Sequence, residues 1–427
     1  MGMQFESPSR KLAWVLLWVA VSVYMLMSAS MLLRLGIPYD APFGSPVAKL
    51  HPGTYCLFLA WFVALSSHGN PLQVLGGQLQ RHRLMGLYLA CMLVVFVWAV
   101  FRHGTSGAAF IIESLWTPAA IVFTLDLLSA QRQRQLVQWV VVLLICNAVL
   151  AVGEVLSPAR LTPLHVGRAD IVAEEYFRAS AFLGHPLHNA LITATLLPAV
   201  TLLPWSSVWK AFVMGVLMLG LLAFGGRTSV VLVVLLYGSY FAARVCSSVV
   251  RGRLSYLQLT GGSVALLAAL TTMGGVVAAS GIGGRIFNNL KIDSSASVRL
   301  RVWDAFSYLS DVDMWVGISP AAIDQISIRM GLDPDYEAIE NFWIYLFMQF
   351  GVIGFVPFLI GLGCLAVVLF KGATPPMRMA MLLYLLVSST ANTLASKTVS
   401  LLLLVLVIFG GAAFRPRVQG RLIRGER

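Results

Sequence analysis

The sequence predicts an all-α, polytopic integral membrane protein with about twelve transmembrane helices and a large outward-facing loop before the tenth. Three observations predict this class. The 427 residues are 58% hydrophobic and only 11% charged, whereas soluble proteins carry about 25% charged residues. The mean hydropathy is +0.82. Finally, the charged residues concentrate in segment 281–341, which holds 14 of the 48 Lys, Arg, Asp and Glu residues in 61 positions.

The apolar segments divide the chain, because one membrane span needs about 20 mostly apolar residues. Candidate spans lie near residues 12–33, 53–68, 84–101, 108–129, 136–155, 187–204, 209–224, 228–243, 255–280, 342–370, 379–395 and 398–414. The predicted regions are an N-terminal transmembrane scaffold of about five spans (1–154), an outer loop (155–187), helices six to nine (188–280), a large loop carrying the site (281–341), the C-terminal transmembrane helices (342–414) and a basic tail (415–427).

The distribution of Lys and Arg predicts the orientation. The first apolar run follows Arg10 and Lys11 and has no small-residue cleavage site, so we expect it to stay as a signal anchor. With the N-terminus inside, the inner connections and the C-terminal tail hold 17 of the 30 Lys and Arg residues, as the positive-inside rule requires. Both termini are then cytoplasmic, and loop 281–341 faces outward. We therefore interpret the net charge of +12 mainly as a topology signal and expect no nucleic-acid partner.

Cysteine usage argues against two other kinds of protein. The five cysteines lie in apolar runs or next to the inner face, so we expect neither a disulfide framework nor a Cys/His zinc site. Asp311 and Asp313 form an acid-x-acid pair of the kind that metal-dependent glycosyltransferases use. The surrounding sequence lacks the alternating strands and helices of such a domain, so we expect no metal site there.

Acidic residues inside apolar runs are candidates for function by default. Glu113 and Asp126 are two such residues in the N-terminal scaffold. Both lie near a predicted span end, where a neighbouring Arg or exposure at the interface is enough to hold them. A structural role is therefore favoured for both.

The outer loop 155–187 ends in RASAFLGHPL, which contains Arg178 and His185. These two residues either cap the next helix at the membrane interface or face the same outward cavity as the large loop. Both readings stay open from the residues alone.

The segment AFGGRTSVV places Arg227 at an outward break between two apolar runs. A guanidinium at this depth needs an anionic partner, and its planar fork suits a phosphate. The alternative partners are a lipid headgroup or a loop carboxylate. We expect Thr228 and Ser229 to cap the following helix.

In the large loop, SVRLRVWDAFSYLS has the spacing of an amphipathic helix at the interface. Arg299 and Arg301 are two residues apart and so point to different faces, which leaves one of them to line a site. The loop ends in Glu340 and Asn341, where the next apolar helix begins. A carboxylate suits a helix N-terminus, and this is the structural alternative to a chemical role for Glu340.

Four stretches, RASAFLGHPLHNA, FGGRTSVVLVV, SVRLRVWDAFSYLSDVDMWVGIS and ENFWIYLFMQFGVIGFVPFL, follow one another in an order and spacing that resemble the O-antigen ligase/polymerase superfamily. The resemblance covers about residues 170–365. It implies substrate-binding roles for Arg178, Arg227 and Arg301, with Arg299 as the competitor of Arg301, and for Asn341. His185 is taken as a further substrate-binding residue. Glu340 stands where the family usually has His, so the resemblance implies that this carboxylate accepts the proton of the acceptor hydroxyl.

The resemblance implies a bacterial inner-membrane glycosyltransferase that works at the periplasmic face without a metal or other cofactor. Its donor is a glycan linked to undecaprenyl diphosphate, whose leaving group needs orientation and charge stabilisation. A polymerase of exopolysaccharide or O-antigen repeat units is favoured. The alternatives are an O-antigen ligase that transfers glycan to lipid A core, and a polysaccharide or lipid transporter. Implied partners are the glycan acceptor, the lipid bilayer and other polysaccharide assembly and export proteins.

Overall fold

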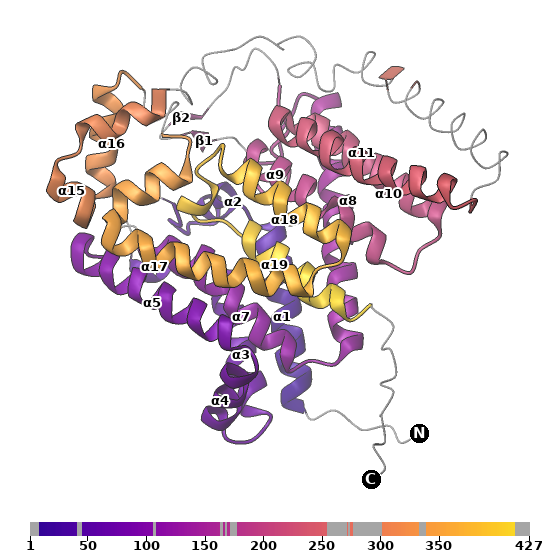
Figure 1. Cartoon of the computed structure of the whole chain (residues 1–427), viewed down its shortest axis with the longest axis horizontal. Coiled ribbons are helices and arrows are strands. Elements are labelled where there is room, and N and C mark those ends of the chain that lie inside the picture. Colours follow the sequence, from indigo (N-terminus) through magenta and orange to yellow (C-terminus); the bar gives the residue numbers. More distant parts are fainter. Residues whose placement is uncertain are drawn as a thin grey trace.

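The computed structural model describes residues 8–40, 45–105, 108–162, 165–166, 169–170, 177–253, 271, 274–275, 301–332 and 339–414. This part of the chain is helical almost throughout (Figure 1). Its one regular β element is a two-residue antiparallel ladder between β1 (His165–Val166) and β2 (Ala169–Asp170). The all-α class is therefore confirmed for the described residues.

Within these ranges, seven helices are long and apolar enough to cross a bilayer. They are α1 (Pro8–Leu26), α5 (Arg83–His103), the continuous unit of α6 (Ala108–Phe110), η2 (Ile111–Trp116) and α7 (Thr117–Asp126), α8 (Ala130–Leu156), α10 (Ser207–Phe224), α11 (Arg227–Val250) and α17 (Phe342–Gly372). These lengths and compositions support a membrane protein.

Four shorter apolar helices occupy other predicted span positions. They are α3 (Pro52–Ser66), α9 (Pro186–Leu196) with η3 (Leu197–Leu202), α18 (Pro375–Ser388) and α19 (Ser400–Ala412). The predicted span 255–280 lies almost wholly outside the described residues. A total of about twelve spans therefore stays a prediction.

The remaining elements are short. They are α2 (Ala29–Arg34), η1 (Pro46–Lys49), α4 (Pro71–Arg81), η4 (Val302–Tyr308), α15 (Asp311–Val316), α16 (Pro320–Arg329) and η5 (Thr393–Ala395). Helix α4 is absent from our sequence prediction because it has few apolar residues. Asn70 caps its N-terminus by accepting a hydrogen bond from Leu72 N at 3.0 Å, as polar N-cap residues commonly do.

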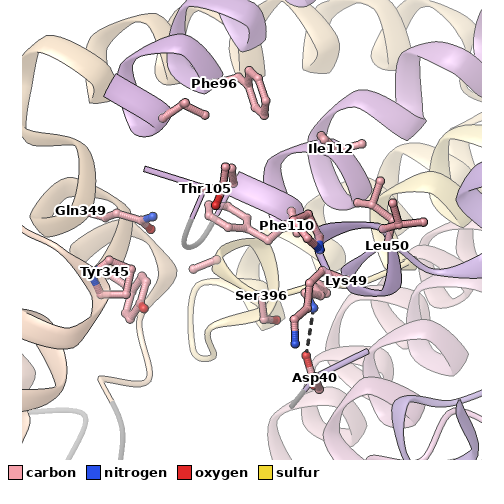
Figure 2. A pocket seen from close by; sticks show the side chains of 18 of the residues that line it. Asp40, Lys49, Leu50, Phe96, Thr105, Phe110, Ile112, Tyr345, Gln349 and Ser396 are labelled. Carbon is pink, nitrogen blue, oxygen red and sulfur yellow. Dashed lines mark ion pairs between the residues drawn. The ribbon is translucent and has the colours of Figure 1, made fainter. Parts of the chain in front are cut away.

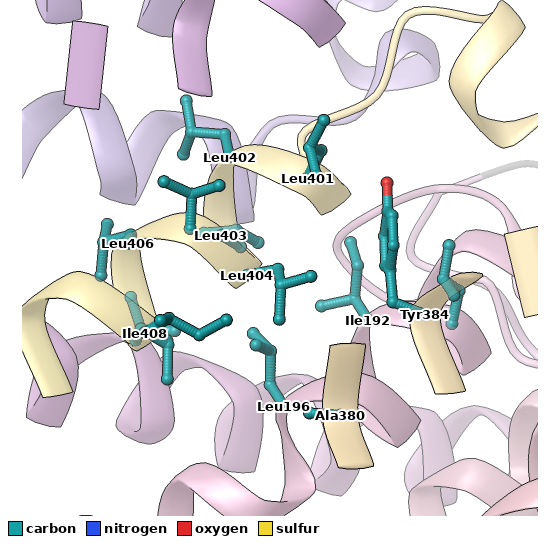
Figure 3. Close-up of a cluster of buried hydrophobic side chains, with 14 of the residues drawn as sticks. Ile192, Leu196, Ala380, Tyr384, Leu401, Leu402, Leu403, Leu404, Leu406 and Ile408 are labelled. Carbon is teal, nitrogen blue, oxygen red and sulfur yellow. The ribbon is translucent and has the colours of Figure 1, made fainter. Parts of the chain in front are cut away.

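The core is built around α19, which is apolar on every face. Leu401–Leu404 and Leu406 are all buried, and Figure 3 shows them beside Ile192 and Leu196 of α9 and Ala380 and Tyr384 of α18. A helix that is hydrophobic all round belongs in the interior of a bundle. Helices α9 and α18 pack together beside it.

Helix α17 is broken at Gly351, whose φ of 60° lies in the region that favours glycine. The second half of the large loop docks at this break. Ile318 N donates to Met348 O at 2.8 Å, and a Cβ on Gly317 would lie 2.3 Å from Gln349 O. Side chains of α5 satisfy the carbonyls that the break frees: Trp98 Nε1 donates to Phe350 O at 2.9 Å, and His103 Nε2 lies 2.9 Å from Gln349 O.

The described half of the large loop, 301–332, has a small core of its own at the N-terminal end of α17 (Figure 1). Val302 and Ala305 are fully buried in it, as the helical spacing predicts. The helix expected over 297–310 can be compared with the structure only from Arg301 onward, where Arg301 is α-helical and the chain then forms the 3-10 helix η4. With three residues per turn, positions three apart share one face, and Val302 and Ala305 are related in this way.

Candidate functional site

A cavity of about 950 Å³ opens between α5, α6, η1, α9, α17 and the 395–397 turn. One part of its wall is apolar and consists of Val47, Leu50, Phe96, Val100, Phe110 and Ile112. The other part is polar and consists of Asp40, Lys49, Thr105, His188, Tyr345, Gln349, Ser396 and Lys397. In Figure 2, Tyr345 and Gln349 extend from α17 on one side, and Lys49, Ser396 and Asp40 lie on the other. Such a wall suits a ligand that is apolar at one end and polar at the other.

Two ammonium groups and one carboxylate meet in the polar wall. Lys397 Nζ lies 3.4 Å from Asp40 Oδ1 and donates to Tyr39 O at 2.6 Å. Lys49 Nζ donates to Pro38 O at 3.0 Å. Partial burial, and then the charge of Lys397, lower the pKa of Lys49, whereas Asp40 acts in the opposite direction. These three groups together leave a net positive charge at the cavity, which favours an anionic ligand.

A buried carboxylate holds the segment that carries Arg178. Glu154, at the end of α8, is 3% exposed. Its Oε2 accepts from Ser180 N at 2.8 Å and from Ala181 N at 3.0 Å, and its Oε1 accepts from Leu161 N at 2.8 Å. The sequence did not point to Glu154, because it is a single acidic residue at the end of a predicted span. Three backbone partners account for its charge.

The same segment is bonded to α10 and α9. Ala179 N donates to Ala223 O at 3.1 Å, and the carbonyl of Arg178 accepts both Nε and Nη2 of Arg160 at 3.1 Å. Asn189 of α9 donates to Ser180 O at 2.7 Å. Arg178 is thereby set beside the C-terminal end of α10 and the first turn of α9.

His185 is the N-cap residue of α9. Burial lowers the pKa of His185 to about 3, and the nearby His188 and Arg178 lower it as well. Its ring centroid lies 5.2 Å from that of His188, a cavity residue. His185 therefore adjoins the cavity through His188, and Arg178 is near enough for its charge to act on His185. His185 holds the N-cap position of α9 but makes no side-chain cap bond.

Arg227 is the first residue of α11, directly after the break at Gly225 and Gly226. A Cβ on Gly226 would lie 2.5 Å from Ala190 Cβ, so only glycine lets the break pack against α9. The expected cap is wrong: Gly226 is the N-cap and supplies no side-chain cap bond, and Ser229 is buried within the first turn. Arg227 stands at the positive end of a 24-residue helix, where an anion is favoured.

Glu340 and Asn341 lie at the start of α17. The Asn341 side chain is the helix cap and accepts from Trp343 N at 3.0 Å and Ile344 N at 3.3 Å. Tyr345 N donates to Asn341 O at 2.9 Å, so the cavity residue Tyr345 is one turn further along. Glu340 is partly exposed at this end of the helix. The side chain of Asn341 thus has a structural role as the cap of α17.

Arg301 is an exposed residue at the N-cap of η4. Its Nη2 donates to Met330 O and ties η4 to the end of α16. Arg299, its competitor in the sequence analysis, lies outside the described residues. Asp313 completes a capping box by accepting from Ser310 N at 3.1 Å and Ser310 Oγ at 2.6 Å. That arrangement explains the acid-x-acid pair as a helix start.

The two acids of the scaffold have structural partners. Asp126 pairs with Arg81 and His82 at 3.3 Å each. Glu113, in the π-helical turn η2, accepts hydrogen bonds from Tyr39 Oη and His51 N. Across the described ranges, no three His, Cys, Asp or Glu side chains gather where they could hold a metal ion.

Comparison with models of protein families and with curated proteins found no match to this chain. The resemblance to the O-antigen ligase/polymerase superfamily therefore stays an expectation from the residues.

The cavity residues themselves were not predicted as a site. Lys49 and Lys397 each lie on a short connection between two apolar runs, where a single lysine gives no signal of a site. Gln349 is the single amide in the apolar run 342–370, and a polar side chain within a span is the signal that points to it.

Proposed function

We propose that the chain is a membrane glycosyltransferase that extends a polysaccharide from polyprenyl-diphosphate-linked repeat units at the outer face of a bacterial inner membrane. The observation that carries this proposal is the cavity with one apolar wall and one polar, net positive wall. A lipid-linked glycan has the same division, with an apolar chain, an anionic diphosphate and a hydroxylated sugar.

In the proposed reaction, the acceptor hydroxyl oxygen forms a bond to the anomeric carbon of the donor sugar. The bond from that carbon to the diphosphate oxygen breaks, and polyprenyl diphosphate leaves with the electron pair. Glu340 takes the hydroxyl proton. Lys49, Lys397 and Arg227 stabilise the charge that develops on the leaving group, and Arg178 and His185 line the approach on the side of α9.

The break in α17 is also a feature of transporters, in which broken helices line ion sites. Here the side chains of Trp98 and His103 in α5 make hydrogen bonds to the carbonyls of Phe350 and Gln349 that the break leaves free. This arrangement favours a fixed site over a moving one.

The test is glycan formation by the purified protein in nanodiscs, supplied with lipid-linked repeat units and, in a parallel reaction, with lipid A core. Longer glycans on the polyprenyl lipid support a polymerase, and transfer to lipid A core supports a ligase. Substrate uptake into sealed vesicles without any new glycosidic bond would overturn the proposal in favour of a transporter. The double variant Lys49→Ala with Lys397→Ala is expected to lose most product. Lys371→Ala, on a predicted inner connection, is the matched control and should keep the wild-type yield.

A further inference from the structure

Gln349 is a buried amide in the cavity wall. It is 1% exposed, and neither its Nε2 nor its Oε1 has a hydrogen-bond partner among the described residues. Buried polar side chains are nearly always paired, so an exception requires an explanation. Leaving an amide in this state destabilises the folded protein, and a ligand is one explanation of why it is kept.

The backbone of Gln349 is held on two sides. The carbonyl oxygen of Gln349 accepts from His103 Nε2 at 2.9 Å. Gly317 packs against the same carbonyl so closely that a Cβ on Gly317 would lie 2.3 Å from its oxygen. The break at Gly351 follows two residues later. Gln349 thus lines the cavity from a fixed backbone segment, which reduces the cost of binding.

The chemistry of the amide indicates the kind of ligand group. A diphosphate is an acceptor of hydrogen bonds, and the ammonium groups of Lys49 and Lys397 already suit it. A prenyl chain needs only the apolar wall. A carboxamide offers a donor and an acceptor side by side, which matches two neighbouring hydroxyl groups, one accepting and one donating.

We propose that Gln349 binds a pair of hydroxyl groups on the sugar next to the diphosphate, and that it thereby sets the preference for a sugar-bearing lipid over the bare lipid. The inference rests on the proposed function for the identity of that lipid. Tyr345 lies one turn before Gln349 on α17, and Ser396 faces them from the other side of the cavity; both belong to the polar wall and complete the sugar-facing part.

The experiment measures binding to the purified full chain in nanodiscs for three probes: polyprenyl diphosphate, the same lipid carrying one sugar, and phosphatidylglycerol as a general anionic lipid. Gln349→Met keeps the size of the side chain and removes the amide. We expect it to weaken binding of the sugar-bearing lipid about tenfold or more, to the level of the bare lipid. Binding of the bare lipid should stay unchanged. The unfolding temperature of Gln349→Met should equal or exceed that of the wild type, because the amide loses no hydrogen-bond partner in the described chain.

The matched control is Gln78→Met. Gln78 is also a buried amide, but it donates to Phe123 O at 2.7 Å and does not line the cavity. This variant should lower the unfolding temperature and keep the preference for the sugar-bearing lipid. The opposite effects of the two variants on stability and binding separate recognition from a structural role.

A wild-type protein that binds both polyprenyl lipids equally would overturn the inference, and so would a Gln349→Met protein that keeps the preference. Loss of stability in Gln349→Met without a change in the preference would assign the amide a structural role and also overturn it. If the preference depends on Gln349 but no glycosidic bond forms in any reaction, the proposed function fails and the recognition of the sugar stands. If glycan forms and Gln349→Met keeps the preference, the function stands and this inference fails.

Discussion

Glu154 is expected to be essential for the position of Arg178, and Glu154→Gln tests this. The carboxylate accepts three backbone N–H groups at 2.8, 2.8 and 3.0 Å. Hydrogen bonds to a charged group are worth about 1.5–3 kcal/mol each, against about 0.5–1.5 kcal/mol for neutral ones. The amide of Gln keeps one acceptor oxygen and turns a donor toward at least one buried N–H. After the lower desolvation cost of a neutral group is allowed for, we expect a loss of about 2–4 kcal/mol.

The measurement is thermal and denaturant unfolding in nanodiscs, followed by glycan transfer at matched amounts of folded protein. We expect Glu154→Gln to lose activity beyond its loss of folded protein, since the segment carrying Arg178 is no longer fixed at Ser180 and Ala181. Asp126→Asn is the matched control, because Asp126 is also an acid near a span end and its side chain is 20% exposed. It should cost about 1 kcal/mol or less and leave transfer intact. Wild-type stability and activity in Glu154→Gln would refute this reasoning.

Three further predictions concern the site residues. Arg227→Lys should lose most glycan transfer although the charge is kept, because the bidentate fork is lost; near-normal product from a well-expressed variant would limit Arg227 to topology. Glu340→Gln should insert normally and lose polymer, while Glu340→His should keep part of the activity because imidazole also accepts a proton; full activity in the Gln variant would end the base hypothesis. His185 has a folded pKa of about 3, below its ordinary value of about 6.5, so its contribution to stability is complete above about pH 6.5 and is lost as the pH falls toward 3. His185→Gln should therefore flatten the fall in unfolding free energy between pH 6.5 and 4, by less than the limit of about 1.4 kcal/mol per pH unit, and an unchanged slope would contradict the assigned burial.

Hydropathy predicted the helices well because each apolar run is a local property of the chain. The expected span 84–101 is α5, and the expected span 342–370 is α17 with its start one residue after Asn341. The break within α17 was not predicted. Gly351 in an apolar run reads as an ordinary helix glycine, and its φ of 60° depends on the contact with Gly317, which comes from a distant loop.

The candidate site was predictable only where a residue breaks a local rule. Arg227 stands out because a guanidinium between two apolar runs is costly, and the structure places it at a helix start beside α9. Arg301 was preferred to Arg299 only through the family resemblance, and its bond to Met330 O could not be predicted because the two residues belong to different elements.

The polar wall of the cavity could not be predicted, because its residues come from distant parts of the chain. Lys49 and Lys397 lie far apart in the chain, and each alone resembles an interfacial residue on a short outer connection. They become a site because the 395–397 turn, which precedes the buried helix α19, lies against Tyr39 and Asp40: Lys397 Nζ donates to Tyr39 O at 2.6 Å and lies 3.4 Å from Asp40 Oδ1. Lys49 lines the same cavity. One carboxylate between two ammonium groups leaves positive charge at the boundary of an apolar wall, and a phosphate attached to a lipid is the ligand that needs both.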